Sequence, residues 1–127
     1  VTKNGKPIHA SGCTQIDRAM VCCSFRPGVS RQDPEIECFL NLLERSQTLR
    51  RLGSAALNLC YVAEGCLDAY WATSVKTWDI AAGYLIAKNA GAIFSNTAGG
   101  DFDLWNPNLV ASSSRELQSA VLDCLKH

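Results

Sequence analysis

The sequence predicts a layered αβα domain built around a mainly parallel or mixed sheet. The first observation is order, because short apolar runs alternate with segments of helical periodicity from residue 19 onward. The second is composition, because 47% hydrophobic and 19% charged residues are typical of a globular α/β protein. The third is length, since 127 residues suffice for one buried core.

The predicted strands are short apolar runs bounded by turn residues. The clearest covers 19–25, where AMVCCSF is continuously apolar, as in a buried strand, and ends at Arg26-Pro27-Gly28. Asn4-Gly5 is a hairpin turn signal ahead of another strand. In full, we expect strands at 6–10, 19–25, 48–52, 67–72, 92–95 and 109–112.

Capping residues mark the predicted helix starts. Asp33-Pro34 is an N-cap followed by proline at the first helical position, which predicts a helix over 34–46. Ser54 and the terminating Gly65 predict a helix over 54–64, apolar almost all round and therefore buried between layers. The expected core face of the earlier helix comprises Ile36, Phe39, Leu40 and Leu43.

Two further helices are predicted toward the C-terminus. Thr77 is the expected N-cap of one and Gly91 its C′ residue, while Trp78 would anchor it by burying its ring. Ser113 and Glu116 form a capping box for the last helix. The expected apolar faces are Trp78, Ala81, Ala82, Leu85 and Ile86 in the first, and Leu117, Ala120, Val121 and Cys124 in the second.

Charge and cysteine content narrow the classes of function. Twelve Lys and Arg residues balance twelve Asp and Glu residues, so nucleic-acid binding is not expected. No run of about 20 apolar residues exists, so no membrane span is expected. The seven cysteines are an odd number without a CxxC pair. They favour buried thiols in a reducing cytoplasm over a disulfide framework or a zinc site.

One carboxylate stands out once the common catalytic motifs are excluded. The sequence has no GxSxG elbow, no dinucleotide or P-loop glycine pattern and no HExxH. Asp79 falls in the first turn of a predicted helix, where the helix dipole favours an ionised carboxylate suited to Mg²⁺. Gly83 would clear space one turn below. Alternatively, Asp79 is an ordinary acidic residue at a helix start.

The junction Gly53-Ser54-Ala55-Ala56 is a second candidate. Free backbone N–H groups at a helix start attract phosphate or hydroxyl oxygens, and small side chains leave room for them. The alternative is an ordinary cap, with Gly53 making the turn and Ser54 the N-cap.

Taken together, segments along the whole chain resemble the inositol monophosphatase family. Residues 78–92 are similar to its C-terminal signature, and residues 50–58 resemble its R-x-x-G-[ST]-A-A segment. Residues 67–71, 97–100 and 4–8 resemble its DAYY strand, T-GG turn and NGxxL hairpin. The resemblance implies the C-terminal half of the inositol-monophosphatase fold, within the Mg²⁺-dependent, lithium-sensitive phosphatase superfamily.

The resemblance also implies a domain organisation. Residues 1–18 would be the end of an N-terminal α+β subdomain, its hairpin strand and linker, and residues 19–127 the C-terminal α/β subdomain. Val1 is no initiator Met and no signal peptide pattern follows, which indicates a fragment or a processed chain. The expected partners are the missing N-terminal half and, in the full-length protein, a second copy in a homodimer.

In this family Mg²⁺ activates a water that attacks a phosphate monoester. By resemblance, Asp79 is the catalytic, metal-binding residue and also lies near the substrate hydroxyls, while Gly53, Ser54 and Ala55 line the sugar pocket. Ala72 stands where many members carry a glutamate that contacts an inositol hydroxyl, and alanine cannot make that contact. Inositol monophosphate is the leading substrate, with histidinol phosphate, a nucleotide bisphosphate and other sugar phosphates left open.

Other departures concern the metal site. The family's upstream glutamate and its D-P-[IL]-D-G-T motif occur nowhere in the sequence, and one aspartate does not displace the water shell of Mg²⁺. We therefore expect the chain alone to be inactive. Asn89 and Ala92, in place of Glu and Gly, are interpreted as packing variations. The alternatives to half of a phosphomonoesterase are a non-catalytic family member that binds a ligand or partner, and an unrelated α/β domain.

Overall fold

The structure is a computed structural model that describes residues 1–26, 28–73 and 75–126; Pro27, in the predicted turn, and His127 lie outside them. The sheet strands are β3 (Met20–Ser24), β4 (Thr48–Arg50), β5 (Ala69–Ala72), β6 (Ile93–Ser95) and β7 (Leu109–Ser112). Their order across the sheet of the described chain is β4–β3–β5–β7–β6. β4, β3 and β5 run parallel, whereas β7 is antiparallel to both neighbours, so the predicted mixed sheet is confirmed.

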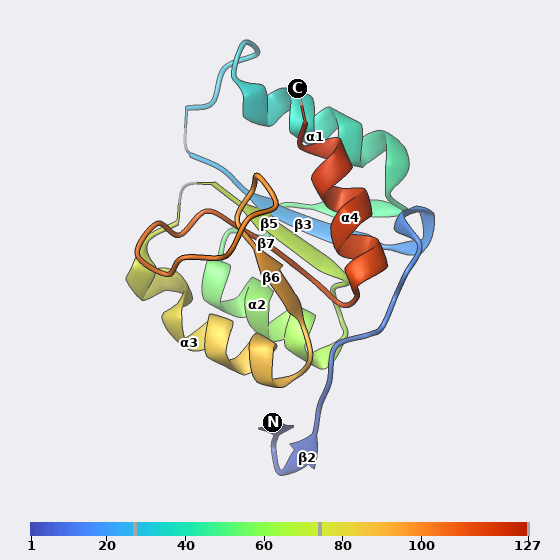
Figure 1. The fold of residues 1–127 in the computed structure, drawn as a ribbon, viewed down its shortest axis with the longest axis vertical. Coiled ribbons are helices and arrows are strands. Elements are labelled where there is room, and N and C mark those ends of the chain that lie inside the picture. Colours follow the sequence, from blue (N-terminus) through green and yellow to red (C-terminus); the bar gives the residue numbers. More distant parts are fainter. Residues whose placement is uncertain (27, 74, 127) are drawn as a thin grey trace.

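Helices cover both faces of the sheet (Figure 1). They are α1 (Pro34–Arg45), α2 (Ala55–Glu64), α3 (Thr77–Asn89) and α4 (Arg115–Cys124). α1 and α4 pack on one face, and α2 and α3 on the other. Because successive strand residues point to opposite faces, Cys23 and Trp71 join the α1–α4 core while Cys22 and Tyr70 join the α2–α3 core. The predicted αβα layering is confirmed.

The first 18 residues lie outside the five-stranded sheet. β1 (Thr2–Lys3) and β2 (Lys6–Pro7) form an antiparallel hairpin across Asn4-Gly5, whose φ angles of 52° and 79° match the predicted turn. The strand expected over 6–10 stops after two residues, because its pairing partner β1 is equally short. A 3₁₀ turn, η1 (Ile16–Arg18), then leads into β3. A subdomain boundary at residue 18 stays a prediction.

The core face of α1 differs from the predicted one. Cys38 and Leu42 are buried, whereas Leu40 and Leu43 are 49% and 51% exposed. Two neighbouring faces of this helix carry apolar residues, and the face that contains Cys38 and Leu42 is the one that packs on the sheet. The predicted residues that do pack against this core are Ile36 and Phe39.

The buried face of α3 is also not the predicted one. Ile80, Gly83 and Ala87 are buried, whereas Trp78 is 80% exposed and Leu85 is 59% exposed. The expectation that Trp78 buries its ring is therefore wrong. The helix is apolar nearly all round, so contacts with α2 rather than its own periodicity decide which side faces inward.

Gly83 explains this choice of face. A Cβ added to it would lie 2.8 Å from Leu59 Cβ and 3.5 Å from the carbonyl oxygen of Ala56, both on α2. The missing side chain thus lets the two helices approach closely. Gly83 thus clears space one turn below Asp79, as expected, and Leu59 of α2 occupies that space.

Two predicted helix caps shift by one residue. α3 has Lys76 as its N-cap, and Thr77 is its first helical residue, whose hydroxyl donates to the Leu104 carbonyl at 2.9 Å. α4 begins after Ser114, whose Oγ accepts a backbone N–H of the first turn at 3.1 Å. Ser113 instead donates to the carbonyl of an upstream loop at 3.0 Å, so it does not cap.

The predicted ends of α2 are confirmed, and its burial only in part. Ser54 is the N-cap, and Gly65 ends the helix with φ 84°. Leu57 is 53% exposed, so the helix is not buried on all sides. In α4 the buried face contains three of the four predicted residues, Leu117, Val121 and Cys124.

All seven cysteines are free, and four of them, Cys22, Cys23, Cys38 and Cys124, are buried. Within the described ranges, no helix combines the length and apolar character needed to cross a membrane.

Candidate active site

The predicted site residues meet at one edge of the sheet. The carboxyl ends of β3 and β4 lie there beside the first turns of α2 and α3, the position at which α/β sheets form ligand pockets. A pocket of about 530 Å³ occupies this position. The lining residues used below are Ser24, Arg51, Gly53, Ser54, Ala55 and Asp79.

Asp79 lies in the first turn of α3, as predicted, and is exposed to the pocket. Its Oδ2 accepts the backbone N–H of Lys76 at 3.0 Å. Within the described part of the chain, Oδ1 has no hydrogen-bond partner. The carboxylate is thus held by one oxygen and offers the other to a ligand or a cation.

The start of α2 forms the adjoining wall. Gly53 has φ 86°, a left-handed conformation that favours glycine, and Ser54 Oγ accepts the N–H of Leu57 at 3.3 Å. The N–H groups of Ala55 and Ala56 have no acceptor among the described residues. Gly53, Ser54 and Ala55 therefore line one pocket with Asp79, and two free donors of a helix start accompany them.

Ala72 does not join this group. It is fully buried at the end of β5, in the core beneath α2 and α3, and pairs with Ser24 of β3. Ser24 does line the pocket, one strand away.

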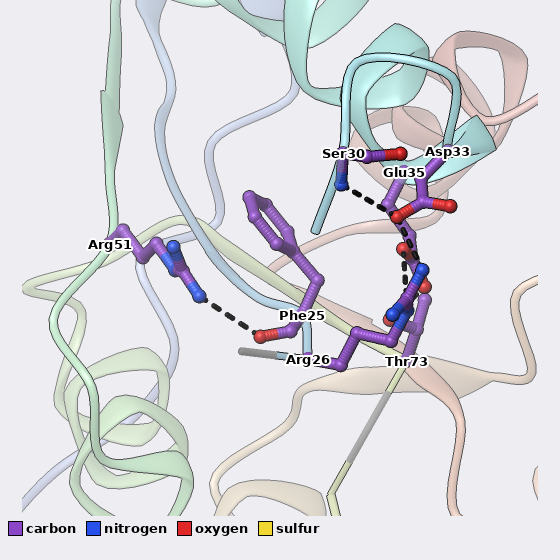
Figure 2. A network of polar contacts seen from close by, with 7 residues as sticks. All are labelled: Phe25, Arg26, Ser30, Asp33, Glu35, Arg51 and Thr73. Carbon is purple, nitrogen blue, oxygen red and sulfur yellow. Dashed lines mark hydrogen bonds and ion pairs between the residues drawn. The ribbon is translucent and has the colours of Figure 1, made fainter. Parts of the chain in front are cut away.

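Arg51 is a pocket residue that the sequence did not single out. Its guanidinium lies 4.2 Å from the centre of the Phe25 ring and donates to the Phe25 carbonyl at 3.0 Å (Figure 2). Ring and carbonyl together hold a positive charge in the wall of the pocket. Its position directly after β4 was the available signal, because a residue there must lie at the carboxyl edge of a parallel sheet.

A polar network holds the loop that follows β3 (Figure 2). The Asp33 carboxylate accepts the N–H of Ser30 at 2.8 Å and is paired with Arg26. These contacts, the Ser30 N–H foremost, lower the pKa of Asp33 below its usual value. Glu35 lies 3.9 Å from the Arg26 guanidinium and accepts the Thr73 hydroxyl at 3.2 Å. The network explains why Asp33 precedes α1 without capping it through its side chain.

The residues present do not make a metal site by themselves. The described chain contains no group of three or more His, Cys, Asp or Glu side chains able to hold an ion. Asp79 is the one acidic residue among those that line the pocket. Mg²⁺ keeps most of its water shell unless several charged oxygens converge, so this chain offers one ligand of an incomplete set.

A second pocket of about 710 Å³ lies on the opposite side, between α1 and α4. It is larger and mainly apolar, and it holds none of the predicted site residues. The pocket that contains Asp79 is therefore the better candidate for phosphate chemistry, because it combines a carboxylate, a guanidinium and free backbone donors.

The sequence is similar to those of known proteins. The model of the inositol monophosphatase family matches residues 1–126. Human inositol monophosphatase 2 is 34% identical over 129 residues, which cover 97% of this chain and 44% of the human protein. Nus factor SuhB of Pasteurella multocida is 44% identical over 88 residues, covering 67% of this chain and 33% of that protein.

Solved structures share the fold. The inositol monophosphatase of Anabaena (Nostoc) sp. PCC 7120 matches with a TM-score of 0.87 at 25% identity, over 98% of this chain and 49% of that one. Mycobacterium tuberculosis SuhB matches with a TM-score of 0.75 at 32% identity, over 93% and 45%. The chain thus spans about half the length of these proteins. Because the family model covers almost every residue and the fold agrees, the chain belongs to the inositol monophosphatase family.

Proposed function

We propose that this chain is the C-terminal part of a Mg²⁺-dependent phosphomonoesterase that hydrolyses inositol monophosphate or a related sugar phosphate. The observation that carries the proposal is the single pocket lined both by Asp79 and by the start of α2. A carboxylate can hold a cation on one side of a phosphate ester, and free backbone N–H groups can bind oxygens on the other.

Asp79 would be one metal ligand of this enzyme. The hydrogen bond from the Lys76 N–H fixes the direction of its carboxylate and leaves Oδ1 available. When bound, Mg²⁺ supplies the charge that activates water and stabilises the leaving alkoxide. The remaining ligands would come from the other half of the full-length protein, since no other acidic residue of the described chain lines the pocket.

The start of α2 would bind the hydroxylated part of the substrate. The N–H groups of Ala55 and Ala56 belong to the first turn of α2, whose donors have no partner within the helix, and they donate to no acceptor among the described residues. Gly53 and Ser54 leave space in front of them. Inositol monophosphate is the leading substrate, and histidinol phosphate or a nucleotide bisphosphate is the alternative, because buried Ala72 offers no polar atom.

The other half of the protein would pack on the outer side of α2 and α3. Leu57, Trp78 and Leu85 are more than half exposed on these helices, although each is large and apolar. Large apolar side chains with this much exposure favour a protein contact. In the full-length enzyme we expect this contact together with a homodimer, in a cytoplasm whose reducing conditions suit the free thiols.

A second candidate is a non-catalytic family member that binds a ligand or a partner. It is favoured by the relatives named Nus factor SuhB, of which one is 44% identical to this chain over 88 residues. The position of Asp79 in an open pocket favours the enzyme instead, because a binding protein has no need of a metal-ligating carboxylate there.

The test measures phosphate release by the full-length protein. The panel comprises inositol 1-phosphate, histidinol phosphate and a nucleoside 3′,5′-bisphosphate, each with Mg²⁺ and with EDTA. We expect Mg²⁺-dependent release, and a loss in kcat/KM of at least about 100-fold in Asp79→Asn, since even outer-shell partners of metals contribute about 10–100-fold. The matched control is Asp123→Asn, an exposed carboxylate on α4.

Three results would contradict the proposal. Release from no substrate favours the non-catalytic candidate. Release that persists in EDTA, or in Asp79→Asn, removes the role given to the metal and to this carboxylate. Turnover by the 127-residue chain alone, abolished by Asp79→Asn, would show that no further ligands are needed.

A further inference from the structure

A polar cluster lies directly beneath the pocket, within an otherwise apolar core. Tyr70 of β5 is fully buried, and its hydroxyl donates to Ser24 Oγ at 2.7 Å. Asn58 of α2 is also fully buried and lies close enough to the Tyr70 hydroxyl to lower its pKa, although its amide atoms make no hydrogen bond of ordinary geometry with the described residues. Buried polar groups are costly, so a cluster retained here requires an explanation.

The direction of the Tyr70–Ser24 hydrogen bond decides what Ser24 can do. The Tyr70 hydroxyl donates to Ser24 Oγ, and burial raises the pKa of the phenol above its usual value, so the group keeps the hydrogen that it donates. A serine hydroxyl has one hydrogen and two lone pairs. Since Ser24 Oγ already accepts from Tyr70, its own hydrogen is free to be donated elsewhere. Ser24 is half-buried and lines the pocket, which is the remaining open direction.

Ser24 also stands beside the position at which a polar contact is missing. Ser24 and Ala72 are paired residues of the adjacent parallel strands β3 and β5, so their side chains point to the same face of the sheet. Ala72 is buried and apolar. The hydroxyl of Ser24 thus lies beside Ala72 on this face of the sheet, lines the pocket and can donate to a ligand there.

We propose that the Ser24 hydroxyl donates a hydrogen bond to a hydroxyl oxygen of the leaving group of a polyol phosphate, and that Tyr70 is the positioning residue that orients it. This specificity contact rests on the proposed phosphatase function. It assigns the pocket a substrate class with a hydroxylated leaving group. A phosphate ester whose leaving group has no hydroxyl gains nothing from it.

The test compares two phosphate esters in the full-length protein with Mg²⁺. Inositol 1-phosphate carries ring hydroxyls, and p-nitrophenyl phosphate carries none in its leaving group. We expect Ser24→Ala to raise KM for inositol 1-phosphate about threefold to tenfold, the effect of one hydrogen bond, with kcat little changed. KM for p-nitrophenyl phosphate should stay the same in this variant.

Tyr70→Phe tests whether the Tyr70 hydroxyl orients Ser24 or whether Tyr70 only packs in the core. It removes the donor but keeps the ring, and we expect a smaller rise in KM for inositol 1-phosphate alone. Because Tyr70 acts through Ser24, the double variant should equal Ser24→Ala rather than show the product of both effects. Ser24→Thr keeps the hydroxyl and should restore most of the affinity. Ser46→Ala removes a hydroxyl at the far end of α1 and is the matched control.

The possible results separate this inference from the proposed function. An unchanged KM in Ser24→Ala, an equal rise for both esters, or multiplicative effects of the two substitutions would overturn the inference. Hydrolysis of p-nitrophenyl phosphate without preference for any hydroxylated ester would overturn it and leave the phosphatase standing. Release from neither ester, with release from another ester of the panel, would overturn the inference alone, and release from no ester of the panel would refute the phosphatase itself and the inference with it. Melting temperatures of all variants identify any that fail to fold.

Discussion

Gly83→Ala tests the close approach of α2 and α3, on which the pocket depends. In an ordinary helix interior, replacing glycine by alanine stabilises a protein by about 1 kcal/mol. Here the added Cβ would lie 2.8 Å from Leu59 Cβ and 3.0 Å from Leu59 Cδ1. The first of these atoms is attached directly to the α2 backbone, so no side-chain rotation removes it and the helices must separate.

The expected magnitude follows from two opposing effects. Overpacking of a core costs about 1–3 kcal/mol, and a contact shorter than 3.0 Å to a fixed atom belongs to the upper part of that range. Subtracting about 1 kcal/mol of helix propensity leaves a net loss of about 1–2 kcal/mol in the free energy of unfolding. Since Asp79 and Ala55 stand at the starts of the two helices, their separation should also raise KM for the substrate.

Urea denaturation of the full-length protein measures the change. The control is Ala82→Gly on the exposed side of α3, which should lose about 1 kcal/mol through propensity alone and so calibrates this helix. If Gly83→Ala stabilises the protein by a similar amount, the contact with Leu59 does not exist in solution. The reasoning about helix packing beneath the site is then refuted.

Two further predictions concern the helix cap and the thiols. Ser114→Ala should lower the free energy of unfolding by about 1 kcal/mol through loss of the cap of α4, whereas exposed Ser119→Ala should change little; equal values in urea denaturation would contradict the cap. At pH 8 a thiol reagent should label exposed Cys66 before Cys23 and Cys38, because burial raises the pKa of Cys23 to about 12 and that of Cys38 to about 11. The folded pKa values of these two thiols exceed the unfolded value of about 8.5. The stability that the protonated thiols contribute therefore falls as the pH rises from about 8.5 toward the folded pKa values. Labelling of all seven cysteines at one rate without denaturant would speak against this burial.

The sequence predicted the layers well because each element carries a local signal. The apolar run of β3, the cap at Ser54 and the glycine at Gly65 are determined by neighbouring residues alone, and the structure confirms them. The caps at Thr77 and Ser113 were each wrong by one residue. The Thr77 hydroxyl donates to the Leu104 carbonyl from within the first turn. Ser113 and Ser114 both donate to the Cys13 carbonyl, and Ser114 is the one whose Oγ accepts a first-turn N–H.

The inward faces of α1 and α3 were predicted less well, for a physical reason. Both helices carry apolar residues on more than one column, so periodicity does not identify the column that is buried. In α1 the buried face contains Cys38. A free cysteine packs like a small hydrophobic residue, but the prediction did not count it as part of the apolar face. In α3 the contact of Gly83 with Leu59, a long-range feature, places Trp78 on the outside.

The pocket shows the same division between local and long-range information. Asp79 and the start of α2 were recognisable from the residue types that begin a helix. For Ser24 and Arg51 the available signal was a position at the end of a strand, and their meeting in one pocket depends on the parallel pairing of β3 with its neighbours. The register that sets Cys22 of β3 against Arg50 of β4 brings Ser24 and Arg51 to the same edge of the sheet.

This chain orients the Asp79 carboxylate but places few other charged groups around it. Its carboxylate is oriented inside this chain, by the Lys76 N–H and by the packing of α3 on α2 through Gly83. The chain's own pocket supplies one positive group, Arg51, and no second carboxylate among the described residues. Under the proposed function, a cation at Asp79 would therefore draw further ligands from the other half of the protein, whereas the contacts to the substrate hydroxyls would come from groups within this chain. Substitutions beneath the pocket should accordingly alter which ester is bound, while the metal requirement stays the same.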